Sequence, residues 1–189
     1  SNEVAAIPHA NIGYCVTQWP PSVTHTISAT DYTDTIYGQI WIDGITNPAG
    51  PAPSLLEQVG YGPDGSDASG SNWTWVTPTF NTQSGNNDEY MGAFLPEAVG
   101  NFDYMYRFST TNGRDWIYCD LLNQTSPTNA SNRGALTVDT SGDVTPPSDP
   151  TDLTASDWGA SFIELTWAGS TDANGIYGYD VYRGDGTGG

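Results

Sequence analysis

The feature that most constrains this chain is a series of short runs in which apolar and polar residues alternate, each ended by Gly, Pro or Asn. Alternation is typical of strands that bury one face, because successive side chains of a strand point to opposite sides. Strands are therefore predicted at 12–19, 23–29, 36–42, 55–61, 73–80, 89–95, 102–109, 115–120 and 135–139. No segment sustains a helical period. We expect an all-β chain whose first part is an antiparallel β-sandwich.

The clearest alternation is FDYMYRFS, where four rings fall on one face of the expected strand: Phe102, Tyr104, Tyr106 and Phe108. The opposite face, with Asp103 and Arg107, is expected to be polar. Asn112-Gly113 favours a turn, because both residues tolerate a positive φ. A returning strand then completes a hairpin. These rings are predicted to be core residues and not a binding surface.

Charge is strongly unbalanced. Twenty-two acidic residues against four Arg and no Lys give a formal charge of −18 and a pI near 4.1. Such a surface repels phosphate backbones and argues against nucleic-acid binding. It suits a secreted or cell-surface protein, a salty medium, divalent cations, or solubility alone. No apolar run reaches the ~18 residues of a membrane span, so no membrane insertion is expected.

Cys15 and Cys119 are the only cysteines, and both lie in strand-like runs. In an extracellular protein such a pair forms a disulfide, which here would close a loop of about 100 residues and stabilise the fold by roughly 4–5 kcal/mol. Two buried free thiols are the alternative.

A boundary is expected near residue 142, where SGDVTPPSDP reads as a short, stiff linker over 143–150. Residues 151–189 then carry Leu153, Trp167 in IELTW, the turn STDANGIYGY, and YDVYR as a third strand. This segment resembles the first half of a bacterial fibronectin type III module. The resemblance implies a partial second β-sandwich with open strand edges, which favour self-association.

Residues 1–142 are expected to form one module. Within it, the stretch from IYGQIWIDGITNPAG through GYGPDGSD and NWTWV to FDYMYRFSTTNGRDWIY covers residues 36–118. Residues 36–120 resemble an immunoglobulin-like accessory module of large secreted bacterial proteins, including starch-degrading enzymes and extracellular nucleases. The resemblance implies an immunoglobulin-like sandwich without a defined catalytic role. The hairpin beginning VGNFDYMYRF is also similar to one in starch-binding sandwich modules, which implies fold more than ligand.

Three tryptophans are candidates for stacking on sugars: Trp41, Trp73 and Trp75. If Ile40 and Ile42 point inward, Trp41 points outward. Trp73 and Trp75 share a face, which could equally be the core face of their strand. Trp19 precedes two prolines and is interpreted as an anchor at a strand end.

Oxygen-rich turns are candidate calcium sites, with the ligands Asn86, Asn87, Asp88 and Glu89 in one turn and Asp64 and Asp67 in another. Neither turn has EF-hand spacing, and solvated turns that cap their own backbone are the alternative. Three sequons are weak candidates for glycosylation, at Asn72, Asn123 and Asn129.

Motifs for catalysis are missing. GYGPDG matches G-x-G-x-x-G, but no helix follows and Pro63 interrupts the amides that would bind phosphate. The sequence contains only two His and no G-x-S-x-G, HExxH or CxxC, and nothing singles out a carboxylate pair among the acids. We therefore expect a non-enzymatic module that binds polysaccharide or another extracellular protein. A spacer, adhesin or filament subunit assembled through strand edges is the alternative.

Overall fold

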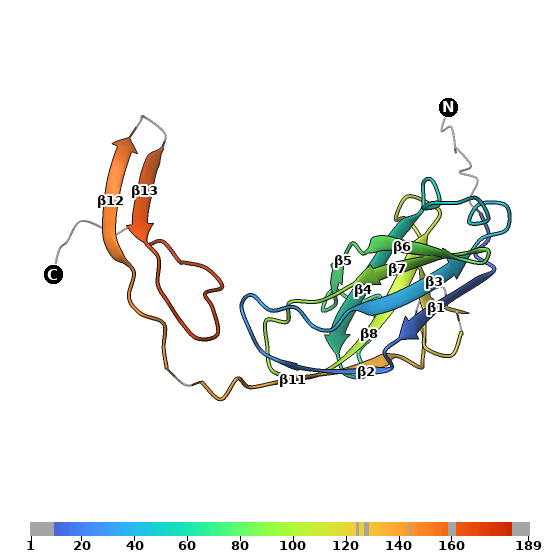
Figure 1. Cartoon of the computed structure of the whole chain (residues 1–189), viewed down its shortest axis with the longest axis horizontal. Helices are drawn as coiled ribbons and strands as arrows, with labels where there is room; N and C mark the ends of the chain where they lie inside the picture. Colours follow the sequence, from blue (N-terminus) through green and yellow to red (C-terminus); the bar gives the residue numbers. More distant parts are fainter. Residues whose placement is uncertain (1–9, 124, 127–128, 144, 159–161, 183–189) are drawn as a thin grey trace, which may run out of the picture.

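A computed structural model describes residues 10–123, 125–126, 129–143, 145–158 and 162–182. These residues form strands, turns and loops, without a helix among them (Figure 1). Eleven strands between residues 14 and 139 build two sheets, of four and seven strands, and two further strands form a separate hairpin. The predicted all-β fold is confirmed, and its main body is arranged as a β-sandwich.

The first sheet has four antiparallel strands, in the order β1 (Tyr14–Trp19), β3 (Ile36–Trp41), β7 (Asn87–Gly92) and β6 (Thr79–Ser84). Figure 1 shows this sheet in front of the other. Alternation along β3 puts Ile36, Gly38 and Ile40 in the core. The residues between them therefore lie on the side of the sheet away from the core.

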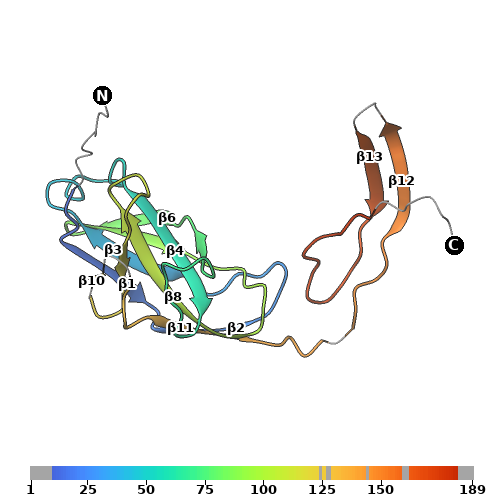
Figure 2. The same cartoon turned by 180° about the vertical axis from the view of Figure 1, so that it is seen from behind.

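The second sheet is built around β8 (Gly100–Ser109), as Figure 2 shows from behind. One edge of β8 pairs with β4 (Leu56–Pro63). The opposite edge of β4 pairs with β5 (Thr74–Val76). The other edge pairs with two strands in succession, β11 (Gly134–Asp139) and β9 (Ile117–Cys119). The sheet is completed by β2 (Ser22–Thr26) beside β11 and by β10 (Thr125–Ser126) beside β9.

The pairing of β2 with β11 is parallel, so the prediction of a purely antiparallel sandwich is wrong at this pair. Only Pro20 and Pro21 separate β1 from β2. Across this connection the chain passes from the first sheet to the second, because β1 pairs with β3 and β2 pairs with β11.

The space between the sheets is filled mainly by aromatic and branched side chains. Tyr104, Tyr106 and Phe108 are fully buried there, and Phe102 packs against them partly buried. The Tyr106 hydroxyl donates to the Ile36 carbonyl across the core, at 2.8 Å. The predicted core role of these rings is confirmed.

A disulfide joins Cys15 on β1 to Cys119 on β9, with the two Cα atoms 5.5 Å apart. It therefore links the first sheet to the second. The Thr17 hydroxyl strengthens the same junction, because it donates to the Cys119 carbonyl at 2.6 Å and accepts from the Tyr106 amide at 2.8 Å. The predicted disulfide is confirmed.

The predicted single strand at 73–80 is wrong, because this segment contributes to both sheets. Its first part is β5, which pairs with β4, and its second part opens β6, which pairs with β7. Thr77 and Pro78 separate the two strands. Proline lacks the amide that a sheet ladder requires and thus favours a change of sheet here.

The hairpin consists of β12 (Thr151–Trp158) and β13 (Ile163–Ala168). The expected third strand at YDVYR does not form in its described residues 179–182, and Arg183 lies outside the described residues. In the described part of the chain, the only sheet partner that β12 and β13 have is each other, so residues 179–182 have no ladder to join.

The loop after β13 contacts the end of the sandwich, near the connection from β2 to β3 (Figure 1). The Tyr177 hydroxyl lies 3.0 Å from the Ser28 carbonyl and 2.8 Å from the Pro96 carbonyl. The Ala29 amide donates to the Asn174 carbonyl at 2.8 Å. The hairpin segment is thus connected to the sandwich by contacts as well as by the chain.

Candidate functional site

The outward side of the first sheet combines rings with amide and carboxylate groups. Tyr37, Gln39 and Trp41 alternate along β3 with the core residues, so all three point away from the core. This confirms the predicted orientation of Trp41. We call the surface the polar–aromatic face and define it by Trp19, Tyr37, Gln39, Trp41, Asn81, Asn87 and Glu89.

Four polar side chains on this face form a hydrogen-bonded network across β3, β7 and β6. Glu89 accepts from Gln39 at 2.9 Å through one carboxylate oxygen and from Asn81 at 2.6 Å through the other. The Gln39 carbonyl oxygen in turn accepts from the Asn87 amide at 3.1 Å. Each member holds its neighbour in one orientation, so donors and acceptors are fixed in the middle of the face before any ligand arrives.

Trp41 lies at one end of the network and is only partly buried. A Cβ atom at the exposed Gly13 would lie 2.5 Å from the Trp41 ring, so the ring occupies the space above that glycine. Gly13 also donates its amide to the Trp41 carbonyl at 3.1 Å. The absence of a side chain at Gly13 thus positions the indole on the outward side of the sheet.

Trp19 lies at the other end of the face. A bulge between Thr17 and Trp19 shifts the register of β1, so that Trp19 pairs with Tyr37. Directly paired residues of antiparallel strands share a face, so Trp19 and Tyr37 lie on the same side of the sheet. The Trp19 side chain is 61% exposed. Trp19 is the last residue of β1, but the exposure of its side chain does not support its interpretation as an anchor.

Trp73 and Trp75 lie far from Trp41, on the outward side of the second sheet. They stack on each other with centroids 5.3 Å apart. The Arg107 guanidinium lies 3.9 Å from the Trp75 centroid and 4.2 Å from that of Trp116. The structure therefore does not bring the three candidate tryptophans together.

This row of Trp73, Trp75, Arg107 and Trp116 packs with Met105 and Tyr118 into a second apolar cluster. The expectation that the Asp103–Arg107 side of the hairpin is simply polar is therefore wrong. Stacking occupies ring surface on Trp75, and Trp73 is only 6% exposed. Neither ring presents the open face that stacking on a sugar requires.

Arg107 is expected to matter for stability. Its guanidinium is half-buried, donates to Gln58 and Tyr118, and is stacked between two indoles. Arg107→Lys keeps the charge but loses the planar stacking, so the free energy of unfolding should fall by about 1–2 kcal/mol. Urea unfolding would measure this loss. Arg114→Lys, at an exposed arginine, is the matched control and should change little.

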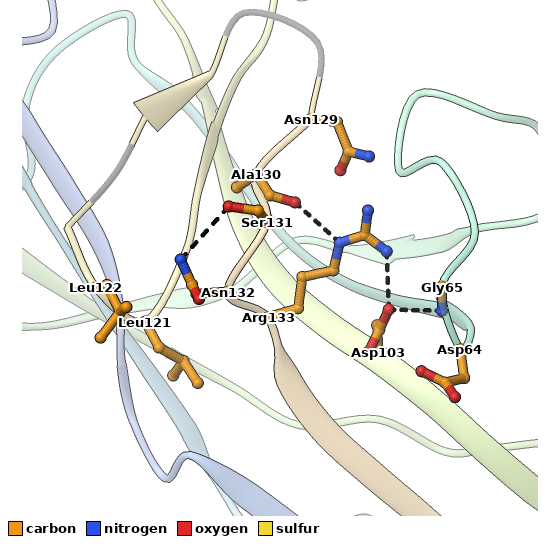
Figure 3. Close-up of a pocket in the computed structure, with 10 residues that line it drawn as sticks. All are labelled: Asp64, Gly65, Asp103, Leu121, Leu122, Asn129, Ala130, Ser131, Asn132 and Arg133. Carbon is orange, nitrogen blue, oxygen red and sulfur yellow. Dashed lines mark hydrogen bonds and ion pairs between the residues drawn. The ribbon is translucent and has the colours of Figure 1, made fainter.

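A cavity of about 800 Å³ lies beside this cluster, between the β4–β5 loop and the segment before β11 (Figure 3). Arg133 crosses it, with an ion pair of 2.8 Å to Asp103 and a hydrogen bond of 2.6 Å to the Ser66 carbonyl. Asp103 also accepts from the Gly65 amide at 2.9 Å. These bonds hold the β4–β5 loop against the second sheet, so Arg133 and Asp103 have a structural role.

The candidate calcium ligands are dispersed. Asp88 faces the core, whereas Asn87 and Glu89 belong to the network on the opposite side of the sheet. In the other turn, Asp67 accepts from the amide and hydroxyl of Ser69. Among the described residues, no group of three or more His, Cys, Asp or Glu side chains is arranged to hold a metal ion. Calcium at these turns stays a prediction from the sequence.

The sequon asparagines differ in accessibility. Asn72 and Asn123 are exposed, while Asn129 is partly buried at the rim of the cavity in Figure 3. Glycosylation at these positions likewise stays a prediction.

Asp88 should make stability depend on pH. Burial raises the pKa of its carboxyl, although the Ala52 amide donates to it at 2.8 Å. A group that binds its proton more tightly when folded destabilises the fold as pH rises from its unfolded pKa, near 4, through its folded pKa. Asp88→Asn should therefore lose less stability than the wild type between about pH 4 and pH 7.

Urea unfolding at the two pH values would measure the difference. Asp67→Asn is the control: hydrogen bonds from Ser69 lower the pKa of Asp67, so its effect on stability has the opposite sign and falls below about pH 4, and this variant should follow the wild type between pH 4 and pH 7. Equal pH dependence in Asp88→Asn and the wild type would contradict the assignment.

The geometry defines an acidic, disulfide-linked β-sandwich with a polar–aromatic face on one sheet and a packed aromatic cluster on the other. No helix in the described ranges is long and apolar enough to cross a membrane. No known family model matches the chain.

The chain is similar over nearly its whole length to part of three proteins named as amylopullulanases. It is 33% identical to that of Thermoanaerobacterium thermosulfurigenes over 98% of this chain, and 31% identical to those of Thermoanaerobacter thermohydrosulfuricus and Thermoanaerobacterium saccharolyticum over 97% and 98%. The chain spans only 10%, 13% and 15% of the length of these relatives. It therefore corresponds to a small part of large proteins.

Proposed function

We propose that the chain is a non-catalytic accessory module that binds a starch-type polysaccharide within a larger secreted or cell-surface protein. The observation that carries this proposal is the polar–aromatic face, where a fixed amide–carboxylate network lies between outward-facing rings. The relatives support the choice of polysaccharide, because each is named as an amylopullulanase.

The chemistry of the face suits a neutral sugar. Sugar rings have apolar C–H surfaces that pack on indole and phenol rings, and hydroxyls that both donate and accept hydrogen bonds. Asn81 and Asn87 supply amide groups and Glu89 supplies a carboxylate, and the buried Gln39 holds Asn87 and Glu89 in place. The formal charge of −18 disfavours anionic polysaccharides.

The module organisation is part of the same proposal. Residues 1–142 would be an immunoglobulin-like module, 143–150 a linker, and 151–189 the first half of a fibronectin type III-like module. The disulfide and the two-sheet architecture support the first assignment, and the hairpin of β12 and β13 supports the last.

Affinity electrophoresis tests the proposed function. The wild-type chain should migrate more slowly in native gels that contain starch or glycogen than in gels without polysaccharide. Gels with cellulose show whether binding depends on the type of glycosidic linkage between the sugar units. Unchanged migration in all three would rule out polysaccharide binding by this chain.

A structural role assembled through exposed edges is the second candidate. It is favoured by an apolar surface on the hairpin segment, where Leu153, Ile163 and Val181 are exposed around a cavity of about 500 Å³. Edge strands and exposed apolar patches are common sites of association. Sedimentation velocity should then show oligomers that increase with concentration, whereas a monomer at all concentrations would exclude this role.

A further inference from the structure

We infer that the polar–aromatic face binds the interior of a linear glucan chain across several consecutive sugar units, with Trp19 forming an additional subsite at its β1 end. This inference rests on the proposed function and states which part of a polysaccharide the face would recognise. It assigns a role to Trp19.

The first argument is the spacing of the rings. Tyr37 and Trp41 are four residues apart on one strand, so their backbones are separated by about 13 Å. Trp19 is paired with Tyr37 in register and adds a further ring on the same side of the sheet. A single sugar, similar in size to the ring on which it stacks, cannot contact both ends of this row, whereas a chain of sugars can.

The second argument is the position of the network. The bonded side chains of Gln39 and Glu89 are neighbours in the register of β3 and β7, and Gln39 lies between Tyr37 and Trp41 on β3. Gln39 is buried and fixes the more exposed Asn87 and Glu89, so a sugar unit above the network would place its hydroxyls on these two side chains while its neighbours stack on the rings. The alternation of apolar and hydrogen-bonding groups on the protein thus matches the repeat of a polysaccharide.

The third argument is the openness of the face. The residues belong to a sheet whose strands lie side by side, and in Figure 1 no other described element crosses in front of β3 and β7. Recognition of a chain end requires a wall that excludes the next sugar. An open face lets the chain continue in both directions and favours an interior segment.

Isothermal titration of the whole chain with glucose, maltose and longer linear α-1,4 oligomers tests this inference. Affinity should increase with oligomer length until the row is filled, and a blocked reducing end should change nothing. Trp19→Ala should weaken binding of the longest oligomer about tenfold and leave binding of maltose within about twofold. Because the Trp19 side chain is exposed, the variant should fold like the wild type, which thermal unfolding verifies.

The failures are distinguishable. If the wild type is not retained by any polysaccharide gel, the proposed function falls and this inference falls with it. If the wild type is retained but affinity does not depend on length, or a blocked end abolishes binding, or Trp19→Ala binds long oligomers normally, the inference alone is overturned. Tyr182→Ala, at an exposed ring on the hairpin segment, is the matched control.

Discussion

Replacing both Cys15 and Cys119 with alanine is expected to lower the free energy of unfolding by about 4–5 kcal/mol, the largest effect of any change proposed for this chain. The two cysteines are 104 residues apart in sequence, and their bond joins the two sheets. Cutting it frees a long loop in the unfolded chain and so favours unfolding through entropy. Urea unfolding of the variant and the wild type would measure the loss.

Two observations separate this cause from a packing defect. The dependence of the unfolding free energy on urea should become steeper, because an unfolded chain without the cross-link exposes more surface. The wild type in a reducing agent should show the same midpoint as the double variant. A reduced wild type that keeps its full stability would contradict the role given to the disulfide.

Trp41→Ala is expected to reduce affinity for starch-type polysaccharide by about tenfold or more. The Trp41 indole lies over Gly13 at one end of the polar–aromatic face. Removing it leaves the hydroxyl-binding network without an apolar surface at that end, and tenfold corresponds to about 1.4 kcal/mol. Gel retardation and titration would both report the change.

Conservative variants define what Trp41 contributes. Trp41→Phe should retain part of the affinity, because a smaller ring still offers a face for stacking. Gly13→Ala should weaken binding indirectly, since its Cβ would displace the Trp41 ring. If Trp41→Ala binds as tightly as the wild type while remaining folded, the polar–aromatic face is not the binding site.

Much of the strand pattern could be predicted from local sequence. Ile40 inward, Trp41 outward and the buried rings of β8 all follow from alternation within a single strand. The disulfide could also be predicted from the sequence, because two cysteines allow only one pairing. Two of the errors arose where the chain changes sheet, at Pro20-Pro21 and at Thr77-Pro78, since local alternation does not specify a strand's partner.

The candidate site could be predicted only in part. Sequence analysis identified Trp41 but joined it to Trp73 and Trp75, which the structure places on the other sheet against Arg107. It missed the contribution of Gln39 and interpreted Glu89 as a cation ligand. Asn87, Glu89 and Gln39 alternate along their strands with residues that face the core, so they point outward. The sequence did not show that the two strands are neighbours, so the hydrogen bonds between these side chains could not be predicted.

By itself the sequence determined which side chains of each strand turn inward, because side-chain direction in an extended chain depends only on the strand's own geometry. Tertiary structure decided which outward side chains meet. Gln39 and Glu89 are 50 residues apart, and Trp19 reaches Tyr37 only through a bulge in β1. Such neighbours depend on strand order and register, which are set by packing across the whole sandwich and by its disulfide.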